Sequence, residues 1–271
     1  MSQLSTEAKT IITLTSDFGY QDPYIAEMKG VILTINPNTT IVDITHDIEK
    51  FNIQMGAFTL ASATPYFPKG TIHLAVVDPG VGTQRRPIII QTKQGYFVGP
   101  DNGLLILAAE NQGIEHINHI TNPKFMLPQT SNTFHGRDIF APAAAYLERG
   151  VKPGEFGPEI FDPVKPEFAQ VKRENGVLIG KILHVDSFGN IITNINKAEL
   201  KQSSIKGQID VKMANCQLQL SFNKTYAETK PNEPLSLIGS HGFLEIALNQ
   251  GSAAKKYQAK VGEDIVVLPA S

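Results

Sequence analysis

Residues 76–86 have the sequence VVDPGVGTQRR, and the rest of the chain is arranged around them. The mostly apolar run 72–77 predicts a buried strand that carries Asp78 directly into a Pro-Gly turn. Gly80 and Gly82 then allow the backbone to bend before two arginines. Open α/β sheets bind ligands at the carboxyl ends of such strands. The stretch therefore predicts a functional site, and the alternative is a structural turn in which Asp78 caps a backbone amide.

Composition limits the classes of function. The chain has 271 residues, 41% hydrophobic and 18% charged, with a net charge of −2. This balance is typical of a globular protein and predicts no nucleic-acid partner and no membrane partner. The N-terminus lacks a secretory pattern, and the single Cys216 excludes an internal disulfide. We therefore expect a soluble, cytoplasmic protein.

The first half of the chain alternates strand and helix patterns. Short β-branched runs predict strands, and apolar residues at helical spacing predict the helices between them. This alternation predicts an α/β N-terminal domain with a mainly parallel central sheet. The expected strands are 11–15, 40–44, 72–77, 88–92 and 96–98, the last two forming a hairpin, and the expected helices are 22–36, 53–61, 104–109 and 139–147.

The pattern changes after a connector, residues 150–166, that holds four prolines and three glycines. Short strand-like runs separated by turns then predict a smaller all-β, barrel-like C-terminal domain. The expected domains are 1–166 and 167–271. The strand-like runs are 177–185, 191–192, 209–211, 218–222, 235–238, 243–247 and 265–268.

Common catalytic motifs are absent from the sequence. There is no phosphate-binding G-x-x-x-x-G-K-[ST] loop and no G-x-S-x-G nucleophile motif, and Arg85 stands where a dinucleotide fingerprint needs its third glycine. His116 and His119 could share a helical face, but they lack a matching carboxylate pattern, so we expect no metal site. Cys216 has no local partner for thiol chemistry, and His73 is better explained as a strand residue than as a functional one.

Polar residues at the ends of predicted segments remain as candidates. Taken singly, each is better explained as a cap or turn residue. Taken together, they outline one polar cleft at the strand ends. They are Asp17, Asp78, Arg85 or Arg86, His135, Asp138, Asp186 and Asn190.

Six segments in this order resemble the S-adenosylmethionine hydrolases, also called S-adenosylmethionine hydroxide adenosyltransferases. The resemblance covers nearly the whole chain, which makes it far more specific than any single loop motif. The segments are TSDFG at 15–19, VDPGVGT at 77–83, PDNG at 100–103, FHGRD at 134–138, DSFGN at 186–190 and SHGFLEIA at 240–247.

This resemblance implies a fold, an assembly and a reaction. The fold is an α/β N-terminal domain followed by a β-barrel-like domain. The assembly is a homotrimer whose active sites lie between one subunit's N-terminal domain and a neighbour's C-terminal domain. The reaction converts S-adenosyl-L-methionine and water into adenosine and L-methionine, without a metal or redox cofactor.

Residue roles also follow from the resemblance. The catalytic set corresponds to Asp78, Arg85 and His135, and Arg85 is preferred to Arg86 because it stands seven residues after the aspartate. The implied substrate contacts are Asp17 with the ribose hydroxyls, Asp186 with the methionine ammonium and Ser240 nearby, and Phe188, Asn190 and Tyr226 around adenine.

Two alternatives to hydrolysis stay open from the residues. Related halogenases transfer halide to the same ribose carbon, but they lack an aspartate at the position of Asp78 and carry a long insertion where this chain has the short turn 93–95. The fluoride enzymes also have Tyr-Ser in place of His135-Gly136. The second alternative is a nucleoside-binding protein without turnover, against which the complete triad argues.

The implied chemistry needs no general acid, because a sulfonium leaves as a neutral thioether. Full deprotonation of water to hydroxide at pH 7 costs about 12 kcal/mol, more than one arginine and one histidine supply without a metal. We therefore expect partial deprotonation in the transition state, with His135 or Asp78 as the base and Arg85 orienting the water.

Overall fold

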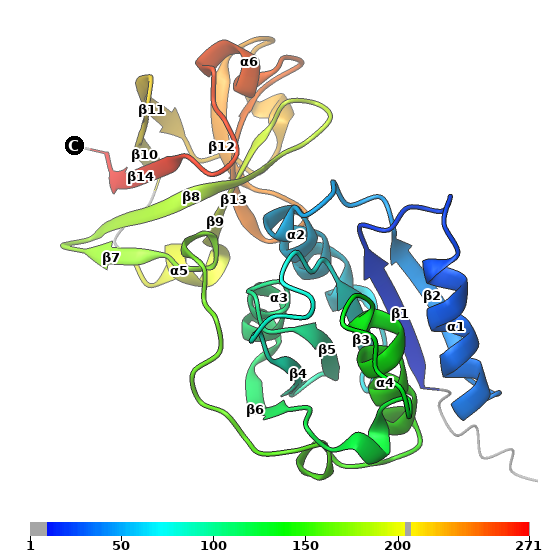
Figure 1. Ribbon diagram of the computed structural model, residues 1–271. Helices are drawn as coiled ribbons and strands as arrows, with labels where there is room; N and C mark the ends of the chain where they lie inside the picture. The colour runs from blue at the N-terminus through cyan, green and yellow to red at the C-terminus, as the bar shows by residue number, and fades with distance from the viewer. Residues whose placement is uncertain (1–9, 204–206, 271) are drawn as a thin grey trace, which may run out of the picture. The chain divides into compact units, whose positions relative to one another are not determined.

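The computed structural model describes residues 10–203 and 207–270 (Figure 1). The chain divides into two compact units, Met1–Lys165 and Pro166–Ser271, and each is described by itself. Within the described residues, no helix is both long and apolar enough to cross a membrane.

The first unit is built on a six-stranded sheet with the order β2-β1-β3-β5-β4-β6. Four of its strands run parallel, as β2, β1, β3 and β5, and the pairs β5–β4 and β4–β6 are antiparallel. The strands are β1 Ile11–Ser16, β2 Thr40–Thr45, β3 Ile72–Val76, β4 Pro87–Thr92, β5 Tyr96–Pro100 and β6 Ile114–His119.

The α/β fold class is confirmed, but the expectation of a mainly parallel sheet is only partly supported. The sheet is mixed because a turn as short as residues 93–95 can join only antiparallel strands, whereas a parallel pair needs a long crossover. The hairpin itself was predicted from the sequence, and its antiparallel pairing is what makes the sheet mixed.

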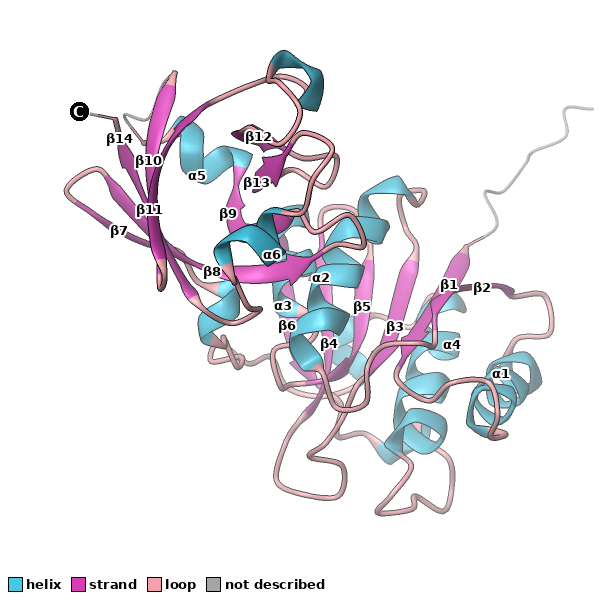
Figure 2. Ribbon diagram, turned by 90° about the horizontal axis from the view of Figure 1, so that it is seen from above, coloured by secondary structure: helices cyan, strands magenta, loops and turns pink. Residues whose placement is uncertain are grey.

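Helices cover both faces of this sheet (Figures 1 and 2). Helices α1 and α4 lie together on one face, and α2 and α3 lie together on the other. Their bounds are α1 Tyr24–Ile35, α2 Ile53–Ala63, α3 Ile106–Gln112 and α4 Ala141–Glu148. Single turns lie at η1 Thr64–Tyr66, η2 Pro123–Phe125 and η4 Pro153–Glu155, and the π-helical turn η3, Gly136–Phe140, leads directly into α4.

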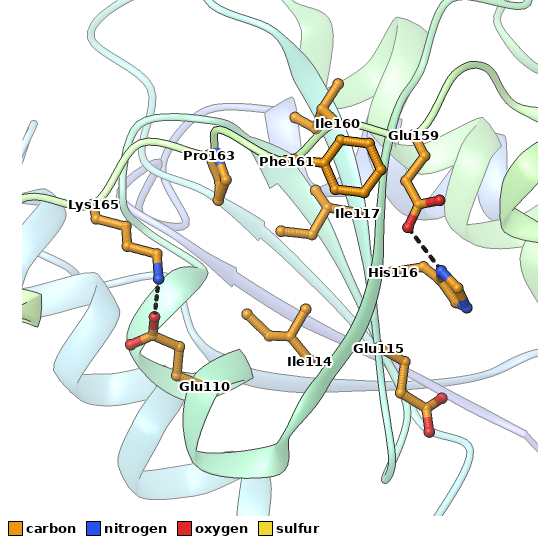
Figure 3. A pocket seen from close by; sticks show the side chains of 10 residues that line it. All are labelled: Glu110, Ile114, Glu115, His116, Ile117, Glu159, Ile160, Phe161, Pro163 and Lys165. Atoms are coloured by element: carbon orange, nitrogen blue, oxygen red, sulfur yellow. Dashed lines mark hydrogen bonds and ion pairs between the residues drawn. The ribbon is translucent and has the colours of Figure 1, made fainter.

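Strand β6 corrects the suggestion that His116 and His119 share a helical face. Both lie in β6, at an odd spacing that sends their side chains to opposite faces of the sheet. The connector runs beside this edge strand and borders a cavity of about 400 Å³ (Figure 3). His116 Nδ1 lies 2.8 Å from Glu159 Oε1 there, and Lys165 Nζ lies 2.6 Å from Glu110 Oε1. Four of the charged or ionisable side chains at this cavity thus form two ion pairs, while Glu115 Oε2 accepts from Gln91 Nε2 at 3.2 Å.

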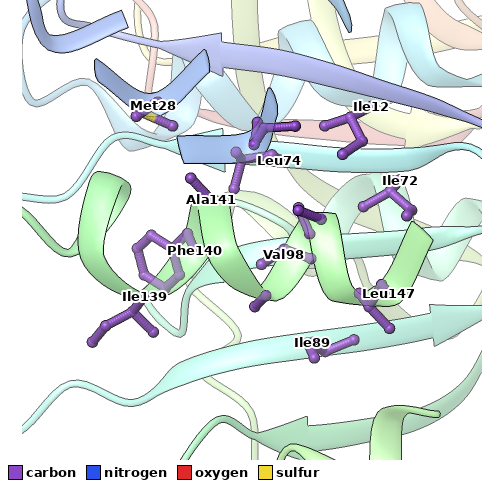
Figure 4. Packing of buried hydrophobic residues seen from close by; sticks show 14 of the residues in the cluster. Ile12, Met28, Ile72, Leu74, Ile89, Val98, Ile139, Phe140, Ala141 and Leu147 are labelled. Atoms are coloured by element: carbon purple, nitrogen blue, oxygen red, sulfur yellow. The ribbon is translucent and has the colours of Figure 1, made fainter. Parts of the chain in front are cut away.

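The core between the sheet and helices α1 and α4 follows the period of two along the strands (Figure 4). Ile12 and Leu14 of β1 and Leu74 of β3 are at most 1% exposed and pack toward these helices. Phe140, the last residue of η3, directly precedes α4 and is fully buried in the same core. This packing fixes the turns that follow β1 and β3.

The second unit is an antiparallel sheet with the order β11-β10-β14-β8-β9-β13-β12, and β7 pairs with β8. A bridge between Phe222 and Ser236 links the two ends of this order, so the sheet is nearly closed and barrel-like, as expected. Its strands are β7 Lys172–Glu174, β8 Val177–Val185, β9 Ile191–Asn196, β10 Gln208–Met213, β11 Cys216–Ser221, β12 Pro234–Ile238, β13 Phe243–Leu248 and β14 Asp264–Pro269. The helical segments are α5 Lys197–Lys201, α6 Ala253–Tyr257, η5 Glu167–Ala169 and η6 Tyr226–Glu228.

Candidate active site

Asp17 and Asp78 lie beside one another at the carboxyl edge of the first sheet. Ser16, the last residue of β1, pairs in parallel register with Val76, the last residue of β3. Asp17 therefore leaves the sheet next to the point from which Asp78 leaves it. Asp17 is 5% exposed and the side chain of Asp78 is also 5% exposed. Two carboxylates are thus held close to the protein interior at one edge.

The turn after Asp78 returns Arg85 to that carboxylate. Arg85 Nε donates to Asp78 Oδ1 at 2.9 Å and to Oδ2 at 3.0 Å, and its Nη2 also donates to Oδ2. Gly82 makes this path possible, since its φ is +75° and a Cβ there would lie 2.4 Å from the backbone oxygen of Asn132. Of the two glycines in the motif, Gly82 is the one that the turn requires.

His135 completes the group from a distant segment. Its Nδ1 lies 2.9 Å from Arg85 Nη2. A guanidinium can only donate, so Nδ1 accepts this hydrogen bond and Nε2 carries the ring proton. Burial, followed by the charge of Arg85, lowers the pKa of His135 below its ordinary value. The neutral ring therefore holds a donor, Nε2–H, ready for a bound oxygen.

Asp138 and Asn102 support this group from neighbouring segments. Asp138, fully buried in η3, accepts hydrogen bonds from the backbone N–H of Ser131 at 2.7 Å and from Arg137 Nε at 2.7 Å. Asn102 Nδ2 donates to the carbonyl of Val77 at 2.9 Å and so fixes the chain immediately before Asp78. Asp138, one of the polar residues predicted to outline the cleft, thus holds the segment that carries His135.

A cavity of about 330 Å³ opens beside these residues. This volume lies within the range of small-molecule sites, about 300–1,000 Å³. Asp17, Asp78 and His135 line it together with aromatic side chains, which are Phe18, Tyr24, Phe51 and Phe134. Arg85 Nη1 is buried and has no hydrogen-bond partner within the described residues. The cavity thus combines apolar walls with two carboxylates, and Arg85, which pairs with one of them, keeps one buried donor unused.

Sequence reasoning missed Lys50 and Phe51 at this cavity. The backbone N–H of Phe51 donates to Asp17 Oδ2 at 2.9 Å, and Lys50 Nζ donates to the Asp17 carbonyl. Phe51 has a φ of +65°, which is uncommon for an aromatic residue, and its ring is 68% exposed. Such strain is characteristic of ligand sites. The available signal was a single aromatic residue in the polar run 49–52 just before a helix.

Asp186, Phe188 and Asn190 form a local turn between β8 and β9 in the second unit. Asp186 Oδ1 accepts the backbone N–H groups of Phe188 and Asn190, both at 2.9 Å, and Oδ2 accepts Asn190 Nδ2 at 2.9 Å. Asn190 is 6% exposed, whereas the Phe188 ring is 79% exposed. The turn thus holds one carboxylate rigidly and leaves one aromatic ring available for contact.

Tyr226 lies near the turn of Asp186 and is hydrogen-bonded to Glu245, which was not among the predicted site residues. Its hydroxyl donates to Glu245 Oε1 at 2.5 Å. Glu245 is 5% exposed within β13, and burial followed by the nearby charge of Asp186 raises its pKa. Ser240 lies in the turn between β12 and β13, directly after Gly239. A glutamate inside the apolar run 243–248 was the signal for this missed residue.

The predicted site residues therefore form one group within each unit. Asp17, Asp78, Arg85 and His135 come together in the first, and Asp186, Asn190 and Tyr226 lie near one another in the second. Over residues 10–203 and 207–270, no three His, Cys, Asp or Glu side chains gather as a metal site.

Comparisons with known proteins agree with the motifs. The family model of the SAM hydroxide adenosyltransferase N-terminal domain matches residues 12–157, and that of the C-terminal domain matches residues 180–266. A curated relative from Methanocaldococcus jannaschii, named (R)-S-adenosyl-L-methionine hydrolase, is 40% identical over 95% of both chains. A relative of the same name from Thermus thermophilus is 36% identical over 93% of this chain and 97% of its own.

A more distant relative and a solved structure also match most of the chain. A fluorinase from Actinoplanes is 28% identical over 96% of this chain and 98% of its own, in an alignment of 291 positions that exceeds the length of this chain. A crystal structure of a conserved Thermotoga maritima protein has a TM-score of 0.81 at 37% identity and covers 95% of this chain and 100% of its own. These matches confirm the resemblance recognised in the motifs, and the chain belongs to the SAM hydroxide adenosyltransferase family.

Proposed function

We propose that this protein hydrolyses S-adenosyl-L-methionine to adenosine and L-methionine through attack of water on the ribose C5′ carbon. The observation that carries the proposal is the hydrogen-bonded series Asp78–Arg85–His135 beside a cavity that Asp17 also lines. Curated relatives at 34–40% identity are named for this activity. Their name specifies the (R) form, so we extend the proposal to the R configuration at the sulfonium.

The chemistry places few demands on the leaving group. The sulfonium leaves as a neutral thioether, so methionine departs without a general acid. The site must instead hold a water in line with C5′ and the sulfur. Such positioning contributes about 7–11 kcal/mol when the reacting atoms are held near contact distance.

We propose different tasks for the three residues, and their hydrogen-bond pattern supports this division. His135 accepts from Arg85 at Nδ1, so its Nε2–H donates and cannot take a proton in this tautomer. Arg85 Nη1 is a second buried donor with no described partner. These two donors suit the oxygen on which negative charge develops. We therefore assign the role of base to Asp78, one of the two residues between which the sequence left the choice open.

Substrate contacts divide between the two units. In the first, Asp17 holds the ribose hydroxyls, and the exposed Phe51 ring offers an apolar contact next to it. In the second, Asp186 meets the methionine ammonium with Ser240 nearby. Phe188, Asn190 and Tyr226 surround the adenine. We also propose the cytoplasmic homotrimer, in which each active site combines the first unit of one subunit with the second unit of a neighbour.

The decisive experiment incubates the purified protein with S-adenosyl-L-methionine, with and without chloride or fluoride, and separates the products by chromatography. We expect equal amounts of adenosine and methionine, independent of halide, and faster turnover of the R than of the S sulfonium epimer. A halogenated nucleoside would instead indicate halide transfer. Bound but unconsumed substrate would indicate a nucleoside-binding protein, and either result would overturn the proposal.

A further inference from the structure

A series of buried polar side chains lies directly behind Asp17. Ser16 is 1% exposed and His46 is 2% exposed. Ser16 Oγ lies 2.7 Å from His46 Nδ1, and His46 Nε2 lies 3.2 Å from Asp43 Oδ1. Asp43 Oδ2 in turn accepts from Lys29 Nζ at 2.6 Å. None of these four residues has a part in the chemistry proposed above.

The donors in this series all point in one direction. The backbone N–H of Phe18 donates to Ser16 Oγ at 3.3 Å, which leaves the serine hydroxyl proton for His46 Nδ1. Nε2 then carries the ring proton and faces Asp43. Burial lowers the pKa of His46, which favours the neutral ring that this arrangement requires. Asp43 therefore lies beyond the His46 ring at one end of the series, and Asp17 lies at the other end.

His46 holds the backbone on both sides of Asp17. Its ring bonds Ser16, the residue before Asp17, and its carbonyl accepts the backbone N–H of Gly19 at 2.8 Å. Asp17 therefore sits on a short loop whose two ends are tied to one residue of the neighbouring strand's exit. We propose that His46 is a positioning residue that acts through Ser16 and sets the direction in which Asp17 meets the ribose hydroxyls. This inference rests on the proposed function, which gives Asp17 that task.

The two ring contacts of His46 differ in quality. The contact with Ser16 is short and makes a hydrogen bond, whereas His46 Nε2 and Asp43 Oδ1 are buried and too poorly aligned to form one. The Ser16 contact therefore carries the positioning, and Asp43 limits only the rotation of the ring. Asparagine and glutamine separate the two contacts, because an Asn amide mimics Nδ1 and a Gln amide mimics Nε2.

The chain provides a matched control in the same sheet. His73 in β3 is also 2% exposed, and its Nδ1 lies 2.8 Å from the hydroxyl of Thr13. This pair lies in the body of the strands, three residues before Ser16 and Val76 in the register. His73→Asn therefore perturbs a buried histidine–hydroxyl pair without touching the loop of Asp17.

The test measures the affinity of adenosine and of 2′,3′-dideoxyadenosine by calorimetry for the wild-type protein, Ser16→Ala, His46→Gln, His46→Asn and His73→Asn. We expect Ser16→Ala and His46→Gln to weaken adenosine about tenfold, which is the loss of about 1.4 kcal/mol. The same variants should bind the dideoxy nucleoside within about twofold of wild type, because it has no hydroxyl for Asp17 to hold. His46→Asn should stay within about threefold for both, and His73→Asn should change neither.

Other outcomes overturn the inference. Equal losses for both nucleosides would indicate a general structural role for His46, and unchanged adenosine binding in Ser16→Ala would exclude positioning through Ser16. Ser16→Ala removes one oxygen only, so it keeps the test available if His46→Gln fails to fold. If the wild-type protein binds adenosine but forms none from S-adenosyl-L-methionine, the proposed function fails while this inference stands. If it binds neither nucleoside, both fail.

Discussion

Two neighbouring arginines, Arg85 and Arg86, each pair with a buried aspartate, yet the two pairs have different surroundings. Arg85 pairs with Asp78 with side chains 8% and 5% exposed, and it passes one hydrogen bond on to His135. Arg86 pairs with Asp101 at 2.6 Å with side chains 25% and 3% exposed. All three of its side-chain nitrogens donate: Nε to Asp101, Nη1 to Asp162 Oδ1, and Nη2 to both Asp101 and the Asp162 carbonyl.

The difference lies in what each pair leaves unused. Arg85 Nη1 is buried without a partner among the described residues, and Asp78, with which Arg85 pairs, lines the cavity of the candidate site. Asp101, in contrast, accepts from Arg86 with one oxygen and from the backbone N–H of Val164 at 2.8 Å with the other, so it ties the connector to the sheet. We call an ion pair saturated when all its hydrogen-bonding groups have partners, and unsaturated when one buried donor has none. A saturated buried pair contributes to folding, whereas an unsaturated one has a donor that can bind a ligand. The same residue types therefore serve stability in one place and chemistry in the other.

The largest effect that separates the pairs concerns turnover. Asp78→Asn removes the proposed base and the charge that holds Arg85, so we expect kcat to fall by about 10²–10⁴-fold. Adenosine affinity should stay within about threefold, because the ribose contact belongs to Asp17. Asp101→Asn is the matched control, and its kcat should stay within about threefold of wild type. Steady-state kinetics with chromatographic detection of adenosine measures both. Similar losses in the two variants would remove the distinction between the pairs.

His135, which accepts a hydrogen bond from Arg85 of the first pair, gives the next effect, which depends on pH. The ring of His135 must be neutral to accept from Arg85, and burial together with Arg85 lowers its pKa. The neutral form therefore persists below the ordinary value of about 6.5, and activity that needs it is lost only as pH falls through the lowered pKa.

We expect kcat to be flat from about pH 8 to about pH 6.5 and to fall at lower pH. His135→Asn keeps an acceptor for Arg85 but loses the Nε2–H donor, so we expect kcat to fall about 10²-fold and the histidine-dependent acid limb to disappear. A pH profile of kcat for both proteins provides the measurement. An acid limb with its midpoint above 6.5 in the wild type would contradict the assigned environment.

Stability is the property in which the second pair should dominate. Asp101→Asn leaves Arg86 with less charge compensation, and the backbone N–H of Val164 loses a charged acceptor. Breaking a buried pair costs about 3–5 kcal/mol, but Arg86 is 25% exposed and can be partly solvated. We therefore expect the free energy of unfolding to fall by about 2 kcal/mol, measured by urea denaturation at pH 7. An unchanged midpoint would show that the saturated pair does not stabilise the fold.

The sequence predicted the elements on which this comparison depends, because their signals are local. The strand before Asp78 follows from a run of apolar residues. The choice of Arg85 over Arg86 for the catalytic set came from the family resemblance and not from a local signal. In the structure Arg85 pairs with Asp78, and Arg86 pairs with Asp101. The π-helical turn η3, which follows His135, has no such local signal, because its conformation depends on how it packs against the sheet.

Features set by tertiary structure were missed. Strand β6 was missed because its polar residues hide the period of two, and its pairing with β4 decides its conformation. Phe51 reaches Asp17 only because parallel strands bring residues 17 and 51 together, at a φ that no local pattern indicates. Glu245 was missed although it is a charged residue within an apolar strand, and only the structure supplies its partner Tyr226.

The smallest effect should come from Asp162, the exposed second partner of Arg86. Asp162 is 81% exposed at its side chain, and its bond to Arg86 Nη1 is one of two contacts between these residues. The other contact is donated by Nη2 to the backbone carbonyl of Asp162 at 2.7 Å, and it survives Asp162→Ala. Solvent and salt screen exposed pairs. We therefore expect unchanged kcat and an unchanged melting temperature for Asp162→Ala in 0.15 M salt. A loss as large as that of Asp101→Asn would mean that the connector is held by the exposed charge of Asp162 rather than by the buried carboxylate of Asp101. The stabilising role given to the saturated pair Arg86–Asp101 would then fail.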